Sequence, residues 1–163
     1  MIKYTIGYLK YKNQILLLNR NKAPNMGLWN GVGGKIEINE TPKDSFIREA
    51  FEETGIILSN PKEVGTVIWN SNRGNGGMYV FFEEFFEKPF IEVNNFDEGI
   101  LAWKEIDWIM NTENKGIVPN IKYYLKEILE NKHDLIHHFM YINGNLLDYK
   151  ICDYEYAMKL LEV

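Results

Sequence analysis

The chain has 163 residues, a formal net charge of −5 and 45% hydrophobic residues. That length suits one folded domain over residues 1–163, and the composition is globular rather than disordered. The acidic balance excludes a general affinity for nucleic-acid polymers, because such affinity requires clustered lysines and arginines. We therefore expect a small-molecule ligand, and the sequence leaves open whether the protein is a monomer or a dimer.

Two further features bear on where the protein acts. No apolar stretch approaches the length of a membrane span, and the opening residues MIKYTIGYLKYK alternate like a strand rather than following a signal-peptide layout. We therefore expect a cytoplasmic protein without a membrane partner. Cys152 is the only cysteine, so no internal disulfide forms, and we expect a buried structural thiol.

Runs rich in β-branched and aromatic residues alternate with turn residues through most of the chain. They predict strands at 2–9, 14–20, 64–70, 78–86, 100–106, 135–142 and 146–151. Asn143-Gly144 joins the last two as a hairpin, because both residues accept the positive φ angles of a tight turn. The strands at 2–9 and 14–20 are predicted to form a hairpin across Lys12 and Asn13, and those at 64–70 and 78–86 to pair around residues 71–77. Helices are predicted at 42–54, with clear ends at Thr41 and Gly55, and at about 120–131. This mixture of elements predicts an α+β fold.

Three glutamates, Glu49, Glu52 and Glu53, lie on one side of the helix predicted at 42–54. Like charges at these spacings destabilise an isolated helix by about 0.2–0.5 kcal/mol per pair. Cations would neutralise the cluster, and hard divalent ions such as Mg²⁺ suit carboxylate oxygens and bridge to phosphates. A solvated acidic face is the alternative interpretation.

The glutamates belong to a longer pattern of fixed spacing. The pattern consists of Gly34, Glu40, Arg48-Glu49-Ala50, Glu52-Glu53 and Gly55-Ile56. At average residue frequencies, its seven fixed and two apolar positions would match by chance in about one chain in ten million. Segment 34–56 thus resembles the signature of the Nudix hydrolase family at every specified position. The resemblance implies an α/β/α sandwich around a mixed β-sheet, with the motif as a loop-helix-loop, and hydrolysis of a nucleoside diphosphate linked to another group.

The resemblance also implies roles for the residues of the motif. Glu49, Glu52 and Glu53 match carboxylates that bind divalent metals, for which we expect Mg²⁺ with Mn²⁺ as an alternative, and the carbonyl of Gly33 joins them. Arg48 matches an arginine that orients the glutamates, since a guanidinium fork binds carboxylates well. The structural positions of the motif are Gly34, Glu40 and Gly55.

Glu98 lies in a loop where the family places an additional metal ligand or general base, although a surface glutamate is the alternative. The resemblance leaves the general base open among Glu49, Glu53 and Glu98. The catalytic candidates are therefore Glu49, Glu52, Glu53, Glu98 and Arg48.

Residues 28–35, LWNGVGGK, narrow the resemblance to MutT-type enzymes that clear oxidised purine nucleoside triphosphates such as 8-oxo-dGTP. Asp97-Glu98, Trp103 and the aromatic C-terminal hairpin extend the likeness more loosely. Asn30 matches an asparagine that hydrogen-bonds the purine, and a turn residue is the alternative. The further candidates for substrate contact are Trp69, Lys35, Arg20 and Asn120.

Each of these candidates has a second interpretation. Trp69 aligns with an aromatic residue at the base pocket, or it belongs to the core. Lys35 and Arg20 reach phosphates, or they lie on the surface. Residues 118–121 read Val-Pro-Asn-Ile where the vertebrate enzymes carry Trp-Pro-Asp-Asp, so the stacking tryptophan and the acidic pair are missing. Asn120 stands where bacterial enzymes use an asparagine, and it either contacts the base or caps the following helix.

The sequence therefore predicts a Mg²⁺-dependent Nudix pyrophosphohydrolase that converts 8-oxo-dGTP, or a related purine nucleotide, to the monophosphate and pyrophosphate. Such an enzyme sanitises the nucleotide pool and so supports DNA repair. ADP-ribose, a nucleotide sugar or an unmodified dNTP is the alternative substrate, and a non-catalytic nucleotide sensor is an alternative of another class. His133, His137 and His138 show no metal-ligand spacing, and we expect them on the hairpin surface or in the core. Residues 71–77 are expected to form a flap near the ligand with Arg73 exposed.

Overall fold

The structure, a computed structural model, describes residues 1–91 and 97–162. Its strands are β1 (Tyr4–Tyr11), β2 (Gln14–Arg20), β3 (Trp29–Asn30), β4 (Lys62–Ser71), β5 (Gly76–Phe85), β6 (Gly99–Glu105), β7 (Leu135–Ile142) and β8 (Asn145–Cys152). Its helices are α1 (Pro42–Thr54), α2 (Ile106–Met110), α3 (Ile121–Leu129) and α4 (Tyr154–Leu161). None of the helices in these residues has the length and apolar character that a membrane span needs.

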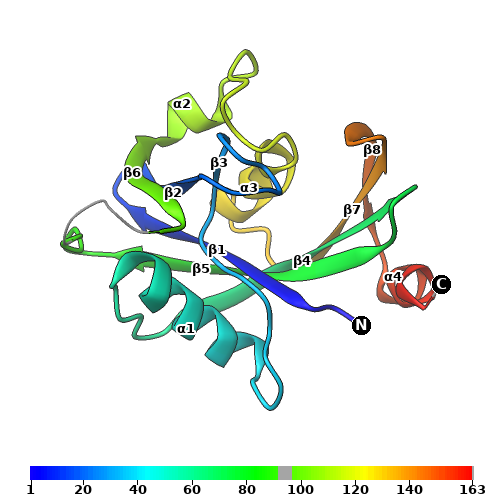
Figure 1. The fold of residues 1–163 in the computed structure, drawn as a ribbon, viewed down its shortest axis with the longest axis horizontal. Coiled ribbons are helices and arrows are strands. Elements are labelled where there is room, and N and C mark those ends of the chain that lie inside the picture. The colour runs from blue at the N-terminus through cyan, green and yellow to red at the C-terminus, as the bar shows by residue number, and fades with distance from the viewer. Residues whose placement is uncertain (92–96, 163) are drawn as a thin grey trace.

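All the strands belong to one mixed sheet. The strand order is β3-β2-β1-β5-β4-β7-β8. Strand β6 lies outside this order and pairs with β2 from Gln14 to Arg20. The pairs β1–β5 and β4–β7 are parallel, and the other neighbours are antiparallel. Helix α1 lies on one side of the sheet, whereas α2 and α3 lie on the other (Figure 1). This architecture confirms the expected α+β fold around a central mixed sheet.

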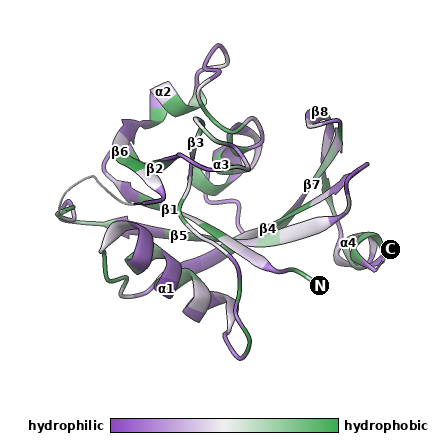
Figure 2. Cartoon of the chain, viewed as in Figure 1, coloured by the Kyte–Doolittle hydropathy of each residue, from purple (hydrophilic) through white to green (hydrophobic). Residues whose placement is uncertain are grey.

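Alternating residues of β1 feed two apolar cores, one on each side of the sheet. Leu9 packs on the α1 side with Phe46, whose ring stacks on Phe81 at a centroid distance of 4.9 Å. Tyr8 packs on the α3 side, where its hydroxyl lies 2.5 Å from the hydroxyl of Tyr124. In Figure 2, hydrophilic residues cover most of the visible surface of α1, and hydrophobic residues concentrate in β2, β6 and α3. The sheet therefore separates the acidic helix from a second, more aromatic core.

The segment from Val32 to Lys35, which leads into α1, pairs with the part of β1 that β2 does not reach. Strand β2 pairs with the last residues of β1, and the chain after β3 pairs with the first ones. Gly7 exchanges two backbone hydrogen bonds with Val32, of 2.7 and 3.1 Å, and Thr5 donates to the Gly34 carbonyl at 2.8 Å. The glycine-rich segment is thus fixed against a central strand directly before α1.

The three predicted hairpins, β1–β2, β4–β5 and β7–β8, and both predicted helices are confirmed. Asn143 and Gly144 have φ angles of 52° and 83°, as the hairpin prediction requires. The sequence interpretation missed β3, α2 and α4. The first two are too short to carry a periodic pattern, and the start of α4 depends on Asp153, whose carboxylate accepts from the Tyr156 backbone N–H at 2.8 Å.

The burial of the histidines and of Cys152 tests two expectations about single residues. His137 and His138 are buried, whereas His133 is exposed, so the interpretation as core or hairpin surface is confirmed. Cys152 is half-buried rather than buried, because it lies near the end of the outermost strand, β8. Its partial burial raises the pKa of the thiol.

Candidate functional site

An open cleft with a volume of about 1480 Å³ is lined by the glutamates of α1 and by residues of strands β1, β2, β4 and β7. It brings together the residues predicted to bind metal or substrate, which are Arg20, Asn30, Gly33, Lys35, Glu49, Glu52, Glu53, Trp69, Glu98 and Asn120, and the structural position Gly34. The other predicted positions, Glu40, Arg48 and Gly55, do not line the cleft. The cleft is large enough for a nucleotide, since ligand pockets typically measure about 300–1,000 Å³.

The ends of α1 are fixed by its own sequence. Thr41 accepts a hydrogen bond of 3.1 Å from the Asp44 backbone N–H, and Pro42 occupies the first turn. Gly55 ends the helix in the left-handed region, with φ 73°, and donates to the Phe51 carbonyl at 2.8 Å. These caps fix where α1 begins and ends, and the burial of Phe46 and Ala50 in the core sets the direction in which its glutamates face.

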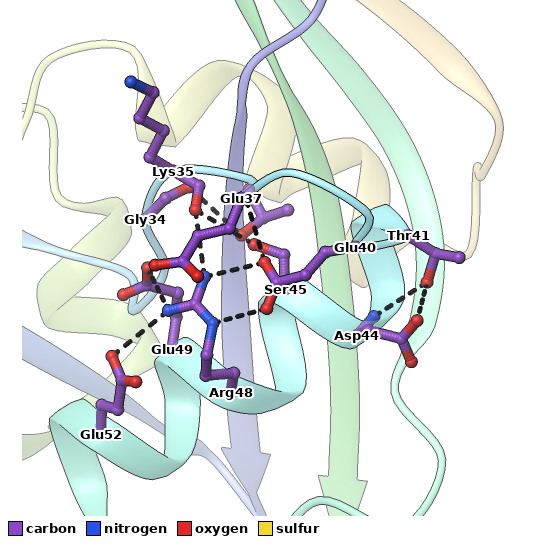
Figure 3. Close-up of polar contacts among 11 residues, drawn as sticks. Gly34, Lys35, Glu37, Glu40, Thr41, Asp44, Ser45, Arg48, Glu49 and Glu52 are labelled. Carbon is purple, nitrogen blue, oxygen red and sulfur yellow. Dashed lines mark hydrogen bonds and ion pairs between the residues drawn. The ribbon is translucent and has the colours of Figure 1, made fainter.

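Arg48 connects the carboxylates of the motif (Figure 3). Its guanidinium binds both oxygens of Glu40, at 2.6 and 2.9 Å. Its Nη1 donates to Glu49 at 2.9 Å and to Glu52 at 3.3 Å, and its Nη2 donates to the Lys35 carbonyl at 3.1 Å. These bonds lower the pKa of Glu40 to about 2 and raise that of Arg48. Arg48 therefore acts through its neighbours, because it orients two carboxylates that face the cleft.

The carboxylate of Glu49 lies directly against the backbone of Gly34. A Cβ atom at Gly34 would stand 2.3 Å from the carboxyl carbon of Glu49 and 2.5 Å from both oxygens. Any side chain at position 34 would displace the Glu49 carboxylate, so glycine is needed for this contact. Partial burial raises the pKa of Glu49, and the hydrogen bond from Arg48 opposes that rise.

Glu53 is the most buried glutamate of the motif, with 6% of its surface exposed. It accepts a hydrogen bond of 2.9 Å from the Gly33 backbone N–H. Burial raises its pKa to about 8; the Gly33 bond and the charge of Arg20 oppose the rise, and the charges of Glu49 and Glu98 add to it. The repulsion from Glu98 indicates that the loop before β6 brings this residue to the same end of the cleft.

Several oxygen atoms at this end accept no hydrogen bond from the described residues. They are Glu49 Oε2, Glu52 Oε1, Glu53 Oε1 and the Gly33 carbonyl. Within residues 1–91 and 97–162, no group of three or more acidic, histidine or cysteine side chains is placed to hold a metal ion without other ligands. An all-oxygen, incomplete set suits a hard divalent ion that keeps water and substrate oxygens as its other ligands. The residues present therefore fit the expected type of metal.

The opposite end of the cleft contains Asn120, which is 9% exposed and precedes α3. Asn120 occupies the N-cap position of α3, but its side chain makes no capping hydrogen bond within the described residues. Its Oδ1 atom is buried without a hydrogen-bond partner among the described residues. Burial raises the pKa of the neighbouring Tyr141 to about 12, and the Asn120 amide opposes that rise. A buried carbonyl without a donor is costly unless a ligand or water supplies one.

Asn30 and Trp69 lie on the walls between the two ends. The side-chain oxygen of Asn30, Oδ1, accepts a bond of 2.8 Å from the Gly31 N–H, which leaves its amide NH₂ for a ligand. Trp69 is half-buried on β4, packs against the aromatic core and lies 6.4 Å from the Tyr4 ring between centroids. Each of these residues thus combines a structural contact with an exposed face in the cleft.

Arg20 and Lys35, the two cations predicted to contact phosphates, differ in their burial. Arg20 ends β2, and its buried Nε has no partner among the described residues. Lys35 is exposed, and its side chain extends away from Arg48 (Figure 3). Arg20 is therefore the better placed of the two to meet an anionic group near Glu53.

The sequence interpretation missed lining residues that come from separate strands, among them Tyr4, Met78 and Tyr141. It also missed how the predicted flap is held. Asn72 Nδ2 donates to the Asn143 side chain at 2.8 Å, and the Asn143 N–H donates back to Asn72 Oδ1 at 3.1 Å. This reciprocal pair joins the β4–β5 turn to the β7–β8 turn, and only the spacing of these residues in three dimensions reveals it.

Comparison with known proteins identifies the family. The sequence model of the NUDIX domain matches residues 3–126, so the chain belongs to the NUDIX domain family. The crystal structure of a mutator MutT protein from Bacillus halodurans superposes with a TM-score of 0.78 at 26% identity, covering 93% of this chain and 97% of that one. Nudix hydrolases generally use divalent metal ions, in agreement with the oxygen-rich end of the cleft.

Two curated relatives match shorter stretches. The uncharacterized Nudix hydrolase YvcI of Bacillus subtilis is 32% identical over 108 residues, or 63% of this chain and 65% of that protein. The oxidized purine nucleoside triphosphate hydrolase of Mus musculus is 33% identical over 64 residues, or 39% of this chain and 41% of that protein. The chain thus spans less than two thirds of each, and other relatives with similarly short matches carry different activities in their names.

Proposed function

We propose that the protein is a Mg²⁺-dependent pyrophosphohydrolase of a purine nucleoside triphosphate, with 8-oxo-dGTP as the substrate, acting in the cytoplasm to keep oxidised nucleotides out of DNA. The observation that carries the proposal is the buried side-chain oxygen of Asn120, which has no hydrogen-bond partner among the described residues, in a cleft whose other end gathers four glutamates. The likeness to the mouse oxidized purine nucleoside triphosphate hydrolase supports the same substrate class.

The acidic end would hold the metal through Glu49, Glu52, Glu53 and Glu98 with the Gly33 carbonyl. When bound, Mg²⁺ neutralises the phosphate chain and lowers the pKa of a coordinated water. Arg48 keeps two of these carboxylates in position through its bonds to Glu49 and Glu52. The remaining carboxylates, Glu53 and Glu98, are then candidates for holding the proton taken from the attacking water, together with Glu49.

The other chain groups bind and orient the nucleotide. Arg20, with its unpaired Nε, is placed to contact the phosphates. Trp69 offers one face to the purine ring, and the NH₂ of Asn30 offers donors to its edge. These contacts hold the base at a fixed distance from the carboxylates.

Asn120 supplies the discrimination. Guanine presents a lone pair at N7, whereas oxidation at C8 places an N–H there. The Asn120 Oδ1 atom would accept a hydrogen bond from that N–H but would face the lone pair of unmodified guanine. A site built around a hydrogen bond rejects an analogue that lacks it, because the buried polar group is left unpaired.

The test is the kcat/KM of the purified protein with Mg²⁺ for 8-oxo-dGTP and for dGTP, with identification of the inorganic product. We expect pyrophosphate and a preference of about tenfold or more for the oxidised base, which equals about 1.4 kcal/mol of differential transition-state binding. Equal or negligible rates on both would reject the proposed substrate and direct the assay to ADP-ribose and nucleotide sugars.

A matched pair of variants tests the residue that carries the proposal. Asn120→Ala should lower kcat/KM for 8-oxo-dGTP by about tenfold and that for dGTP much less, because it removes one hydrogen bond made to the oxidised base. Asn145→Ala, at an exposed asparagine outside the cleft lining, should leave both values unchanged. An unchanged ratio of the two substrates in Asn120→Ala would remove Asn120 from base recognition.

A further inference from the structure

Strand β8 forms the end of the sheet. It pairs with β7 on one side, and in the described part of the chain no strand pairs with its other side. Figure 1 places it at the outer margin of the molecule, with α4 packed against β7. An edge strand presents a row of free N–H and C=O groups, which natural proteins either protect or use for pairing.

The sequence of β8 is symmetrical in chemical character about Tyr149. Asp148 and Lys150 flank it with opposite charges, and Leu147 and Ile151 flank these with apolar side chains. Both charged residues are exposed and form no ion pair among the described residues. Leu147 is 56% exposed and Ile151 is 48% exposed, so the strand carries unusual apolar surface for a free edge.

We propose that β8 is a dimer interface, in which it pairs antiparallel with β8 of a second copy about a two-fold axis through Tyr149. In this register Asp148 lies opposite Lys150 of the second copy, and Leu147 lies opposite Ile151. Because the axis repeats every contact, two ion pairs and two apolar pairs form at once. Opposite charges directly across an antiparallel pair stabilise it, and a two-fold interface must be self-complementary in this way.

The centre of the strand is held rigidly for such pairing. The Tyr149 hydroxyl lies 2.9 Å from His137 Nδ1, and its ring packs 4.9 Å from Phe139 and 4.8 Å from Tyr123 between centroids. The register between β7 and β8 shifts at Met140/Tyr141, next to Leu147, which places a bulge there. The bulge interrupts the regular strand at Leu147, so the new ladder is most regular at Asp148, Tyr149 and Lys150, which are symmetrical about Tyr149.

The interface is continuous with one wall of the cleft. The β7–β8 hairpin contributes Tyr141 and Gly144 to the cleft lining, and Asn143 binds the β4–β5 turn. A second copy paired to β8 would therefore restrain the same hairpin that borders the ligand. The charge symmetry favours a copy of this chain over an unrelated extended segment, because an unrelated segment has no reason to present lysine and aspartate in the mirrored order.

Sedimentation analysis of the full chain over a wide range of concentrations tests the proposal. The unchanged protein should form a dimer. Asp148→Lys and Lys150→Asp should each raise the dimer Kd by about tenfold or more, because each places like charges opposite one another twice. The double variant Asp148→Lys/Lys150→Asp should restore the Kd to within about threefold of the original, since it exchanges the partners of each pair.

A control with the same charge changes uses α4. Glu155 and Lys159 form an exposed ion pair of 2.7 Å with each other on α4, so Glu155→Lys and Lys159→Glu should leave the Kd unchanged. A monomer at all concentrations would overturn the proposal. So would a dimer that ignores the single changes at β8, or a double variant that stays as weak as the single ones.

A cross-linking experiment checks the register independently. In a Cys152→Ser background, Tyr149→Cys should form an intermolecular disulfide on oxidation, because Cα atoms across antiparallel pairs lie about 4.5–5.5 Å apart, within disulfide reach. Asp148→Cys should cross-link far less, since its opposite residue is Lys150 of the second copy. A dimer in which Asp148→Cys cross-links better than Tyr149→Cys would overturn the two-fold register. If Tyr149→Cys does not fold, the Kd of the double variant Asp148→Lys/Lys150→Asp tests the register instead.

Discussion

The two ends of the cleft differ in how many of their polar groups are already bonded to the protein. At the acidic end, one guanidinium binds three carboxylates and a backbone carbonyl, and the Gly33 N–H binds a fourth carboxylate. At the opposite end, Asn120 Oδ1 is buried without a hydrogen-bond partner among the described residues. The difference suggests an acidic end whose carboxylates the protein itself orients, for chemistry that is the same for any substrate, and an opposite end whose buried amide oxygen takes its partner from the substrate.

The largest effect is expected from neutralising the buried carboxylate of the acidic end. Glu53→Gln should lower kcat by about a thousandfold, within the usual range for a lost acid–base or metal-binding group. It should also raise the Tm at pH 7 by about 2 °C or more, because burial penalises the charged form of Glu53 and glutamine lacks that charge. Rate assays and calorimetry of the same preparation check both effects.

Metal binding provides the control for Glu53→Gln. Mg²⁺ should raise the Tm of the unchanged protein, since a ligand that binds only the native state stabilises it, and should raise that of the variant much less. A variant that loses activity and stability together would indicate a structural role for Glu53 instead.

A second prediction tests the backbone contact at the acidic end. Gly34→Ala should lower kcat/KM by about a hundredfold, because the added Cβ displaces the Glu49 carboxylate and misplacements of about 1 Å have costs of that size. Gly55→Ala is the matched control. It introduces a side chain at φ 73° with open space around it, so it should cost about 1 kcal/mol of stability and leave kcat/KM unchanged. Equal activity of the two variants would show that the position of Glu49 does not matter.

A smaller effect is expected where the two turns meet at the other end. Asn72→Ala removes both hydrogen bonds to Asn143 and should raise KM about threefold at unchanged kcat, since each exposed bond contributes about 0.5–1 kcal/mol at most. Asn75→Ala, which removes only a bond to the Leu160 carbonyl, should leave KM unchanged. A change in kcat rather than KM would assign the turn to catalysis instead of binding.

The smallest effect concerns stability in acid. Burial lowers the pKa of His137 to about 4, below its ordinary value of 6.5, so the unfolded chain takes up a proton before the native protein does. The free energy of unfolding should therefore fall as the pH decreases from about 6.5 to 4. His137→Gln should flatten that dependence in urea unfolding curves taken across this range. An identical slope in both proteins would mean that the pKa of His137 is the same in the native and the unfolded state.

The acidic end could be predicted from the sequence because its determinants are local. The cap at Thr41, the end at Gly55 and the spacing of Glu49, Glu52 and Glu53 all lie within one helix and its flanks. A helix converts such spacing directly into a face. The opposite end depends on β4, β7 and the residue before α3, which are adjacent only through the sheet, so no spacing in the sequence relates Trp69 to Tyr141 or Asn120.

The elements that the sequence did not predict illustrate the same limit. Strand β3 has two residues and exists because β2 and the turn at Gly116 lie beside it. The sequence indicates that Asn120 starts α3, but it cannot show that the Asn120 side chain makes no capping hydrogen bond there. Local chemistry was therefore readable in advance, whereas pairing partners and side-chain directions were not.

The two parallel pairings impose an order on synthesis. Strand β1 lies beside β5, and β4 lies beside β7, so the second partner of each pair leaves the ribosome long after the first. Helix α1 and its supporting strands β1 and β5 are all available once residue 85 has emerged, whereas the wall formed by β7 and β8 needs residue 152. We expect a nascent chain that can build its acidic helix early and must wait for its last hairpin before it can hold a nucleotide.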